Sequence, residues 1–226
     1  MLRRSEKRWR SILDSLLEVI PVYEKMNVYM SLGIIHKLRE KAAVKASGRL
    51  TLDLGSGPGP MAKFLAKYSY EVVMLDPLPE MLKTASPPNV MTYRVVGIGE
   101  ALPFRPSAFD SVVAAFSLRD VVDLATCISE THAVLRKGGK LVVLELRKPN
   151  NRLWEKVVGL YWRFTVPLMA LIVARKSWGA YKEMYRTYSE LPRAKEFLSL
   201  LKEFYADVEE EKVALGAAHI VTALKG

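Results

Sequence analysis

The chain has few cysteines and histidines, the residues that form disulfide bonds and bind metals. Its 226 residues include one cysteine, Cys127, and three histidines, with no Cys/His cluster that resembles a metal site. A lone cysteine excludes an intramolecular disulfide bond. We expect Cys127 to be a structural residue on the buried side of a helix at 121–135. The N-terminal residues lack the pattern of a cleavable signal, and there is no internal repeat or low-complexity tract. Half of the residues are hydrophobic, enough at this length to bury a full core.

Two common phosphate-binding motifs are also missing. A dinucleotide site would need glycine at position 60, where Pro60 stands, and no Gly-Lys-Ser/Thr follows. What is present is an apolar strand near residues 50–54 that carries Asp53 and leads into Gly-x-Gly-x-Gly. The loop consists of Gly55, Ser56, Gly57, Pro58 and Gly59. An acidic strand end followed by this spacing is the pattern of S-adenosylmethionine-dependent methyltransferases of the Rossmann-like class.

A second acidic residue follows the next apolar strand. Residues 71–75 read as a buried strand that ends at Asp76, followed by Pro77. An acidic residue at this place can accept hydrogen bonds from both hydroxyls of a ribose. We expect Pro60 to open the intervening helix, because proline suits the first helical position.

The rest of the chain alternates apolar strands with helical segments, as in a doubly wound fold. Further strands are predicted at 91–96, 109–116, 140–145, about 205–210 and 213–224, and helices at 60–68, 78–84 and 121–135. This pattern predicts an α/β, Rossmann-like, doubly wound and mostly parallel seven-stranded sheet. We expect an N-terminal helical extension over 1–48 and a methyltransferase domain over 49–226, with a helical lid insertion at about 151–190.

The formal charge of +10 is not spread evenly, because a basic cluster at the N-terminus has only Glu6 against it. The cluster consists of Arg3, Arg4, Lys7, Arg8 and Arg10. A basic helix there is able to lie on an anionic membrane, to bind RNA phosphates or simply to pack on the core. The apolar segment Trp154–Ala174 is nearly long enough to cross a bilayer, but Arg163 and Pro167 interrupt it. We interpret this segment as a cover over a bulky apolar substrate, with membrane contact, or as a helical pair packed on the core or a partner subunit.

Several motifs together identify a family. The segments Tyr23–Asn27 and Met30–Gly33, then Glu100–Phe104 and Leu118–Val121, and finally Leu135–Gly139 and Leu144–Pro149 resemble the ubiquinone/menaquinone biosynthesis C-methyltransferase family. The resemblance implies C-methylation of a prenylated quinone or hydroquinone, with S-adenosylmethionine as cofactor. We expect a cytoplasmic enzyme that contacts the membrane surface peripherally and forms a homodimer. The chain departs from the family pattern at Asp120, which replaces asparagine, and at Ile98 and Ser117.

The expected cofactor residues lie at the ends of successive strands. They are Asp53, the Gly55–Gly59 loop, Asp76, Pro77, Ile98, Gly99, Glu100 and Ser117. For catalysis we expect Arg119 to hold a developing oxyanion, Tyr23 to direct the hydroxyl or a water, and Asp120 to orient Arg119 or the water. His36 and His132 are alternatives as the base.

Two other functions stay open at this point. An RNA methyltransferase fits the basic charge, but the chain has no Asn/Asp-Pro-Pro-Tyr motif and no second RNA-binding module, so we expect no nucleic-acid partner. The second alternative is a non-catalytic adaptor that binds S-adenosylmethionine and acts at membranes or partner proteins. Such an adaptor would not need Arg119.

Overall fold

The computed structural model describes residues 13–86 and 90–226. The chain divides into two compact units. The first joins residues 1–36 to 148–191, and the second joins 37–147 to 192–226. The predicted N-terminal extension and the insertion at 151–190 therefore fall largely within one unit. The basic cluster from Arg3 to Arg10 lies outside the described residues.

The second unit is built on a seven-stranded sheet with the strand order β3-β2-β1-β4-β5-β7-β6. All neighbouring strands pair in parallel except at β7, which runs antiparallel to both β5 and β6. The strands are β1 Gly48–Leu54, β2 Ser69–Asp76, β3 Met91–Val96, β4 Phe109–Ala115, β5 Leu135–Leu146, β6 Asp207–Val213 and β7 Ala218–Leu224. The predicted doubly wound, mostly parallel sheet is confirmed.

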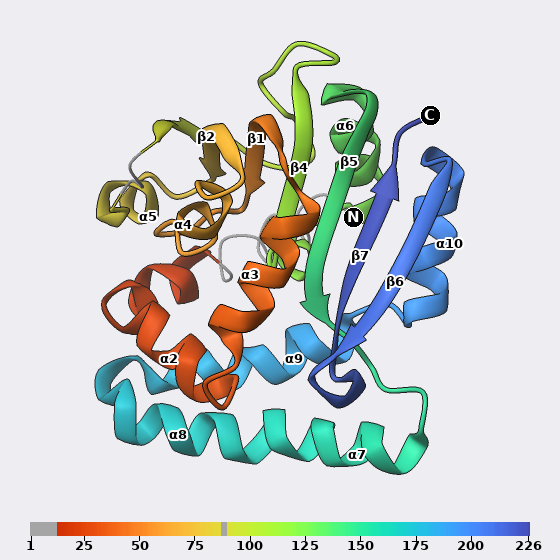
Figure 1. Cartoon of the computed structure of the whole chain (residues 1–226). Coiled ribbons are helices and arrows are strands. Elements are labelled where there is room, and N and C mark those ends of the chain that lie inside the picture. The colour runs from red at the N-terminus through yellow and green to blue at the C-terminus, as the bar shows by residue number, and fades with distance from the viewer. Residues whose placement is uncertain (1–12, 87–89) are drawn as a thin grey trace. The chain divides into compact units, whose positions relative to one another are not determined.

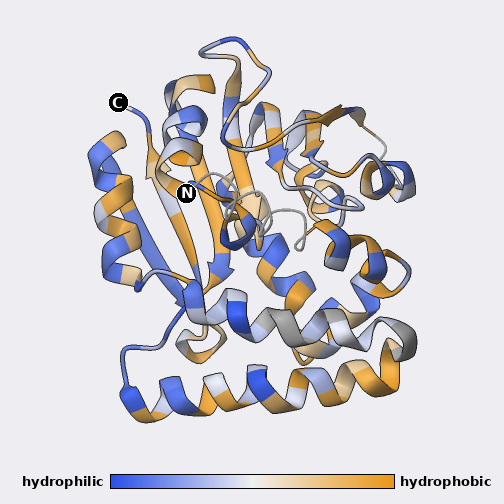
Figure 2. Ribbon diagram, turned by 180° about the vertical axis from the view of Figure 1, so that it is seen from behind, coloured by the Kyte–Doolittle hydropathy of each residue, from blue (hydrophilic) through white to orange (hydrophobic). Residues whose placement is uncertain are grey.

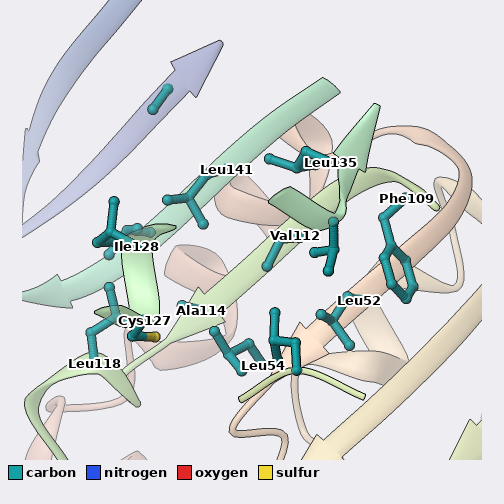
Figure 3. Packing of buried hydrophobic residues seen from close by; sticks show 14 of the residues in the cluster. Leu52, Leu54, Phe109, Val112, Ala114, Leu118, Cys127, Ile128, Leu135 and Leu141 are labelled. Atoms are coloured by element: carbon teal, nitrogen blue, oxygen red, sulfur yellow. The ribbon is translucent and has the colours of Figure 1, made fainter. Parts of the chain in front are cut away.

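Helices cover both faces of this sheet, with α3 in front and α6 and α10 behind in Figure 1. The elements are α3 Ile35–Lys45, α4 Ala62–Leu65, α5 Pro79–Thr84, η2 Leu118–Asp120, α6 Leu124–Val134, α10 Ala194–Phe204 and η5 Ala214–Gly216. Alternation along β1 sends Leu52 and Leu54 into the core beneath α6, where they join Cys127 and Ile128 (Figure 3). The intervening Asp53 therefore faces the α3 side. Cys127 is fully buried, as predicted.

Two local predictions were wrong at element ends. Pro60 does not open the helix, because α4 is a single turn that begins at Ala62. The strand predicted at 140–145 begins earlier, because the preceding helix ends at Val134, close to the predicted 135, and β5 begins at once at Leu135. Gly138 has a φ of +73°, and the pairing of β4 with β5 shifts register near Ser111. The stretch around Gly138 is therefore an irregularity inside β5.

The order of the strands creates a topological switch point between β1 and β4. From β1 the chain winds outward through β2 and β3, and from β4 it winds the other way through β5. Ligands of doubly wound sheets bind beyond the carboxyl ends of the strands at such a point. The predicted cofactor residues of this unit follow those strand ends.

The regular elements in the described part of the first unit are all helices. It contains helical residues 13–19, η1 Ile20–Val22, α2 Tyr23–Met30, α7 Arg152–Leu160, η3 Tyr161–Thr165, α8 Val166–Val173, η4 Arg175–Lys182 and α9 Glu183–Glu190. The Tyr161 hydroxyl donates to the Met30 carbonyl at 2.8 Å, and the Trp162 ring stacks on Tyr188 with centroids 6.1 Å apart. The first contact ties the segment before β1 to the segment between β5 and β6, and the second holds the latter segment together.

Candidate active site at the carboxyl edge of the sheet

The path of the loop between β1 and α4 depends on its glycines. Its three glycines have φ values of +69°, +54° and +80°. At Gly55 a Cβ would lie 2.4 Å from Ser117 Cβ, so glycine is required for space as well as for conformation. The Gly55 and Ser56 amides donate to the Leu75 carbonyl at 2.8 and 3.0 Å, which fixes the start of the loop against β2.

Asp76 clamps the middle of the same loop. Its carboxylate accepts the Gly57 amide at 2.8 Å through Oδ2 and the Leu78 amide at 2.9 Å through Oδ1. Burial raises the pKa of Asp76, while these two amides act in the opposite direction. Because a carboxylate offers about four acceptor positions, two remain for ligand hydroxyls. Asp76 as the ribose acceptor stays a prediction, and the geometry leaves room for it.

Asp53 is a fully buried carboxyl group beneath the loop. Burial raises its pKa to about 7, with Arg39 lowering it and Asp76 raising it further. Among the described residues, Asp53 Oδ2 has no hydrogen-bond partner. A buried acidic oxygen without a partner, beneath this glycine loop, fits a ligand that carries a cation. The methionine end of S-adenosylmethionine carries an ammonium group and meets this requirement, so the residues present fit the cofactor.

Arg39 was not predicted from the sequence. It is 3% exposed and acts electrostatically on Asp53. A signal did exist, because Leu38, Ala42, Ala43 and Ala46 form the buried stripe of α3, and Arg39 lies within that stripe at helical spacing. A charged residue in a buried stripe marks a site where a partner charge is needed.

Ile98, Gly99 and Glu100 follow β3 and lie at the same carboxyl edge of the sheet as the glycine loop and Asp76. A Cβ at Gly99 would lie 2.7 Å from Cys127 Sγ, so the loop rests directly on α6. Glu100 Oε1 accepts the amides of Val122 and Asp123 at 2.7 and 3.3 Å. Ile98 is 38% exposed and offers an apolar surface, which is suited to an aromatic base.

Ser117 and Arg119 follow β4 on the other side of the switch point. The Ser117 hydroxyl donates to the Leu54 carbonyl at 2.7 Å, next to Gly55. Arg119 Nη1 lies 3.4 Å from Glu145 Oε1, and Arg119 Nε lies 3.9 Å from Asp120 Oδ2. Burial raises the pKa of Glu145, and Arg119 acts against that shift. The structure thus brings Arg119 and Asp120 together, as predicted, and adds Glu145 as a buried partner.

Glu145 was not predicted as a site residue, because it lies near the end of β5 within the apolar run Leu141–Leu146. The signal was the same one that singled out Asp53 and Asp76, an acidic residue at the end of an apolar strand. Applying one rule to all parallel strands would have found it.

Tyr23 and the histidines are placed differently. Tyr23 belongs to the first unit, at the start of α2, and its catalytic role stays a prediction. His36 Nδ1 lies 3.8 Å from Glu24 Oε1 in that unit. His132 lies in the last turn of α6, before β5 begins, and its ring packs on Tyr205 with centroids 5.3 Å apart. This is the amino edge of the sheet, so the geometry does not support His132 as a base.

The raised pKa of Asp53 predicts how cofactor binding depends on pH. Below about pH 7 the carboxyl group is protonated in the free protein, and above it the ionised form attracts the cationic cofactor. We expect affinity for S-adenosylmethionine to increase from pH 5 to 7.5, by up to about tenfold per pH unit below the pKa. Isothermal calorimetry across this range measures the slope, and Asp53→Asn should remove it. An unchanged slope in Asp53→Asn would assign the titration to another group.

Comparison with known proteins agrees with this architecture over the whole chain. The model of the ubiE/COQ5 methyltransferase family matches residues 1–225. The ubiquinone/menaquinone biosynthesis C-methyltransferase UbiE of Geobacter sulfurreducens is 31% identical over 241 residues, which cover 100% of this chain and 92% of the relative. A demethylmenaquinone methyltransferase of Chlorobaculum parvum is 32% identical over 203 residues, covering 85% and 83% of the two chains.

A solved structure of an S-adenosylmethionine-dependent methyltransferase from Thermotoga maritima shares the fold, with a TM-score of 0.62 at 16% identity. It covers 94% of this chain and 100% of its own. The edge of the sheet carries the predicted cofactor loop with its buried acidic residues, and the family model spans residues 1–225. The chain therefore belongs to the ubiE/COQ5 methyltransferase family and is an S-adenosylmethionine-dependent methyltransferase.

Proposed function

We propose that the enzyme methylates a ring carbon of a prenylated hydroquinone of the menaquinone or ubiquinone type. The names of the relatives support this substrate class, since they describe quinone-pathway and demethylmenaquinone methyltransferases. The observation that carries the proposal is the Arg119–Glu145 pair beside the cofactor loop. It supplies a fixed cation where a phenolate would need one.

The chemistry asks little of the protein. When bound, S-adenosylmethionine supplies an electrophilic methyl group on a sulfonium centre. The chain must orient the ring, exclude water and help the ring hydroxyl lose its proton, which makes the neighbouring carbon nucleophilic. The resulting oxyanion is stabilised by a preorganised positive charge.

Arg119 is suited to hold this oxyanion because its guanidinium stays charged at any working pH. Its side chain is only 13% exposed and is fixed by Glu145, which is itself 5% exposed. Glu145 acts through Arg119 and is a positioning residue. Asp120 lies next to Arg119 and is the candidate to orient a relaying water, with Tyr23 as the second candidate.

We further propose that the enzyme works in the cytoplasm and meets its lipophilic substrate at the membrane surface, without crossing the membrane. Dimerisation, the domain division at residue 48 and the role of residues 151–190 as a lid remain predictions.

Methyl-labelled S-adenosylmethionine tests the proposed function directly. The protein is incubated with a chemically reduced lipid extract from the source cells, with the same extract after oxidation, and with total RNA. We expect label in the quinone fraction of the reduced sample alone, because only the hydroquinone can form a phenolate. The label should survive cleavage of aryl methyl ethers, which separates carbon from oxygen methylation. Label in RNA, or label lost with the ethers, would contradict the proposal.

A further inference from the structure

The longest helix of the first unit runs without a break from Arg152 to Val173, through α7, η3 and α8. It has 22 residues and is long and apolar enough, by length and composition, to cross a membrane. At about 1.5 Å per residue it measures about 33 Å. Pro167 does not break it, because the preceding turn widens and the Val166 amide donates to the Tyr161 carbonyl.

One side of this helix is buried. Val158, Trp162, Val166 and Ala170 follow one another at intervals of four residues, and each is less than 9% exposed. Trp162 stacks on Tyr188, and the neighbouring Tyr161 hydroxyl bonds to Met30 within the same unit. The helix is therefore attached along its length by this side.

The opposite side carries large apolar side chains in water. They are between 44 and 74% exposed and follow helical spacing. We call them the exposed stripe: Leu153, Val157, Leu160, Phe164, Leu168, Leu171 and Ile172. Figure 2 shows hydrophobic residues dominating the α8 end of this helix, with hydrophilic residues between them towards α7. Soluble proteins rarely leave such a continuous row uncovered.

The charges on the same helix are almost all positive. Arg152, Lys156 and Arg163 are exposed, and Glu155 is the only acidic residue among the 22 and is half-buried. A stripe of aliphatic and aromatic side chains with basic neighbours is the pattern of a helix that lies in the interface of an anionic membrane. The long basic side chains reach the lipid head groups while the apolar ones enter the acyl boundary.

Two other occupants fit less well. A helix that crossed the bilayer would place Arg163, near its middle, in the hydrocarbon centre, and its buried stripe would have to leave the unit. A second copy of the chain would bring basic residues against basic residues, since residues 152–173 include no exposed acidic side chain to pair with them.

We propose that the exposed stripe of Arg152–Val173 is a membrane-docking surface that inserts in the plane of an anionic leaflet. The proposal rests on the proposed function in one respect, that a prenylated hydroquinone resides in the membrane. The surface itself is read from exposure and charge alone, so vesicle binding can be measured without methyl transfer.

Co-sedimentation of the full chain with vesicles provides the test, using neutral phosphatidylcholine with and without 30% phosphatidylglycerol. We expect binding to the anionic vesicles and much weaker binding to the neutral ones. The double variant Phe164→Gln/Leu168→Gln should lower the partition coefficient at least tenfold. Lys156→Gln/Arg163→Gln should lower it several-fold on anionic vesicles alone.

The matched control replaces exposed apolar residues outside the stripe, in Tyr70→Gln/Met91→Gln. These side chains are 80 and 60% exposed in the second unit, and their loss should leave binding unchanged. Equal binding of the wild type and the stripe variant would overturn the proposal. So would a dimer in solution that the stripe variant dissociates while no form binds vesicles. Methyl transfer to a short-chain, water-soluble hydroquinone should persist in the stripe variant, and its absence in every form would count against the proposed function alone.

Discussion

Arg119→Ala should lower the rate constant of methyl transfer by about 10²- to 10³-fold while leaving S-adenosylmethionine affinity nearly intact. This is the typical loss when one preorganised donor to a developing oxyanion is removed. The Arg119 guanidinium is held by Glu145 and Asp120 after β4 and is not part of the glycine loop, so the cofactor contacts should survive. Single-turnover kinetics with saturating cofactor, together with calorimetry, separate the two quantities.

Arg49→Ala is the matched control, because Arg49 also pairs with a carboxylate, Glu71, but is 81% exposed at the start of β1. It should leave turnover unchanged. Glu145→Gln should slow methyl transfer less than Arg119→Ala, and the double variant should be no slower than Arg119→Ala, since Glu145 acts through Arg119. If Arg119→Ala instead abolished cofactor binding, Arg119 would belong to the cofactor site.

The second large effect is expected for Asp76→Ala, which should weaken S-adenosylmethionine binding about 100-fold or more. The carboxylate fixes the loop through the Gly57 amide and has acceptor positions left for the ribose. Hydrogen bonds to a charged acceptor contribute roughly 1.5–3 kcal/mol each. Calorimetry or equilibrium dialysis measures the dissociation constant.

Asp110 offers an unusually close control for Asp76. It is similarly buried, and its Oδ2 accepts the amides of Arg49 and Leu50, both at 2.7 Å, but it lies at the amino edge of the sheet. Asp110→Ala should lower the melting temperature as Asp76→Ala does and leave cofactor affinity of the folded protein unchanged. Equal losses of affinity in both variants would mean that Asp76 matters only for stability.

The fold was predictable because its signals repeat. Buried parallel strands appear as apolar runs, and this pattern located β1, β2, β4 and the second half of β5 in the sequence. The edge strand β3 was located as well, although it is largely exposed. The ends of elements were harder. Pro60 looked like a helix start, but the three positive-φ glycines before it extend the loop, and the helix is only one turn long. There the path of the glycine loop outweighed the preference of proline for the first position of a helix.

The site was predictable where chemistry coincides with a strand end, as at Asp53 and Asp76. Arg39 was missed because its importance comes from burial next to Asp53, a contact between α3 and β1 that no local spacing encodes. Glu145 is the partner of Arg119 from the neighbouring strand, and that pairing follows from strand order rather than from either sequence segment.

Gly99 packs closely on Cys127, the only cysteine of the chain, so the reactivity of this thiol reports local motion at the site. Burial raises the pKa of Cys127 to about 12, and its sulfur lies where a Gly99 side chain would begin. The native thiol is therefore shielded from alkylating reagents, which attack thiolates. Each labelling event requires α6 to move away from its neighbours, among them the Gly99 loop. The rate of alkylation, read by mass as a single addition per molecule, therefore reports how often this side of the predicted cofactor site opens.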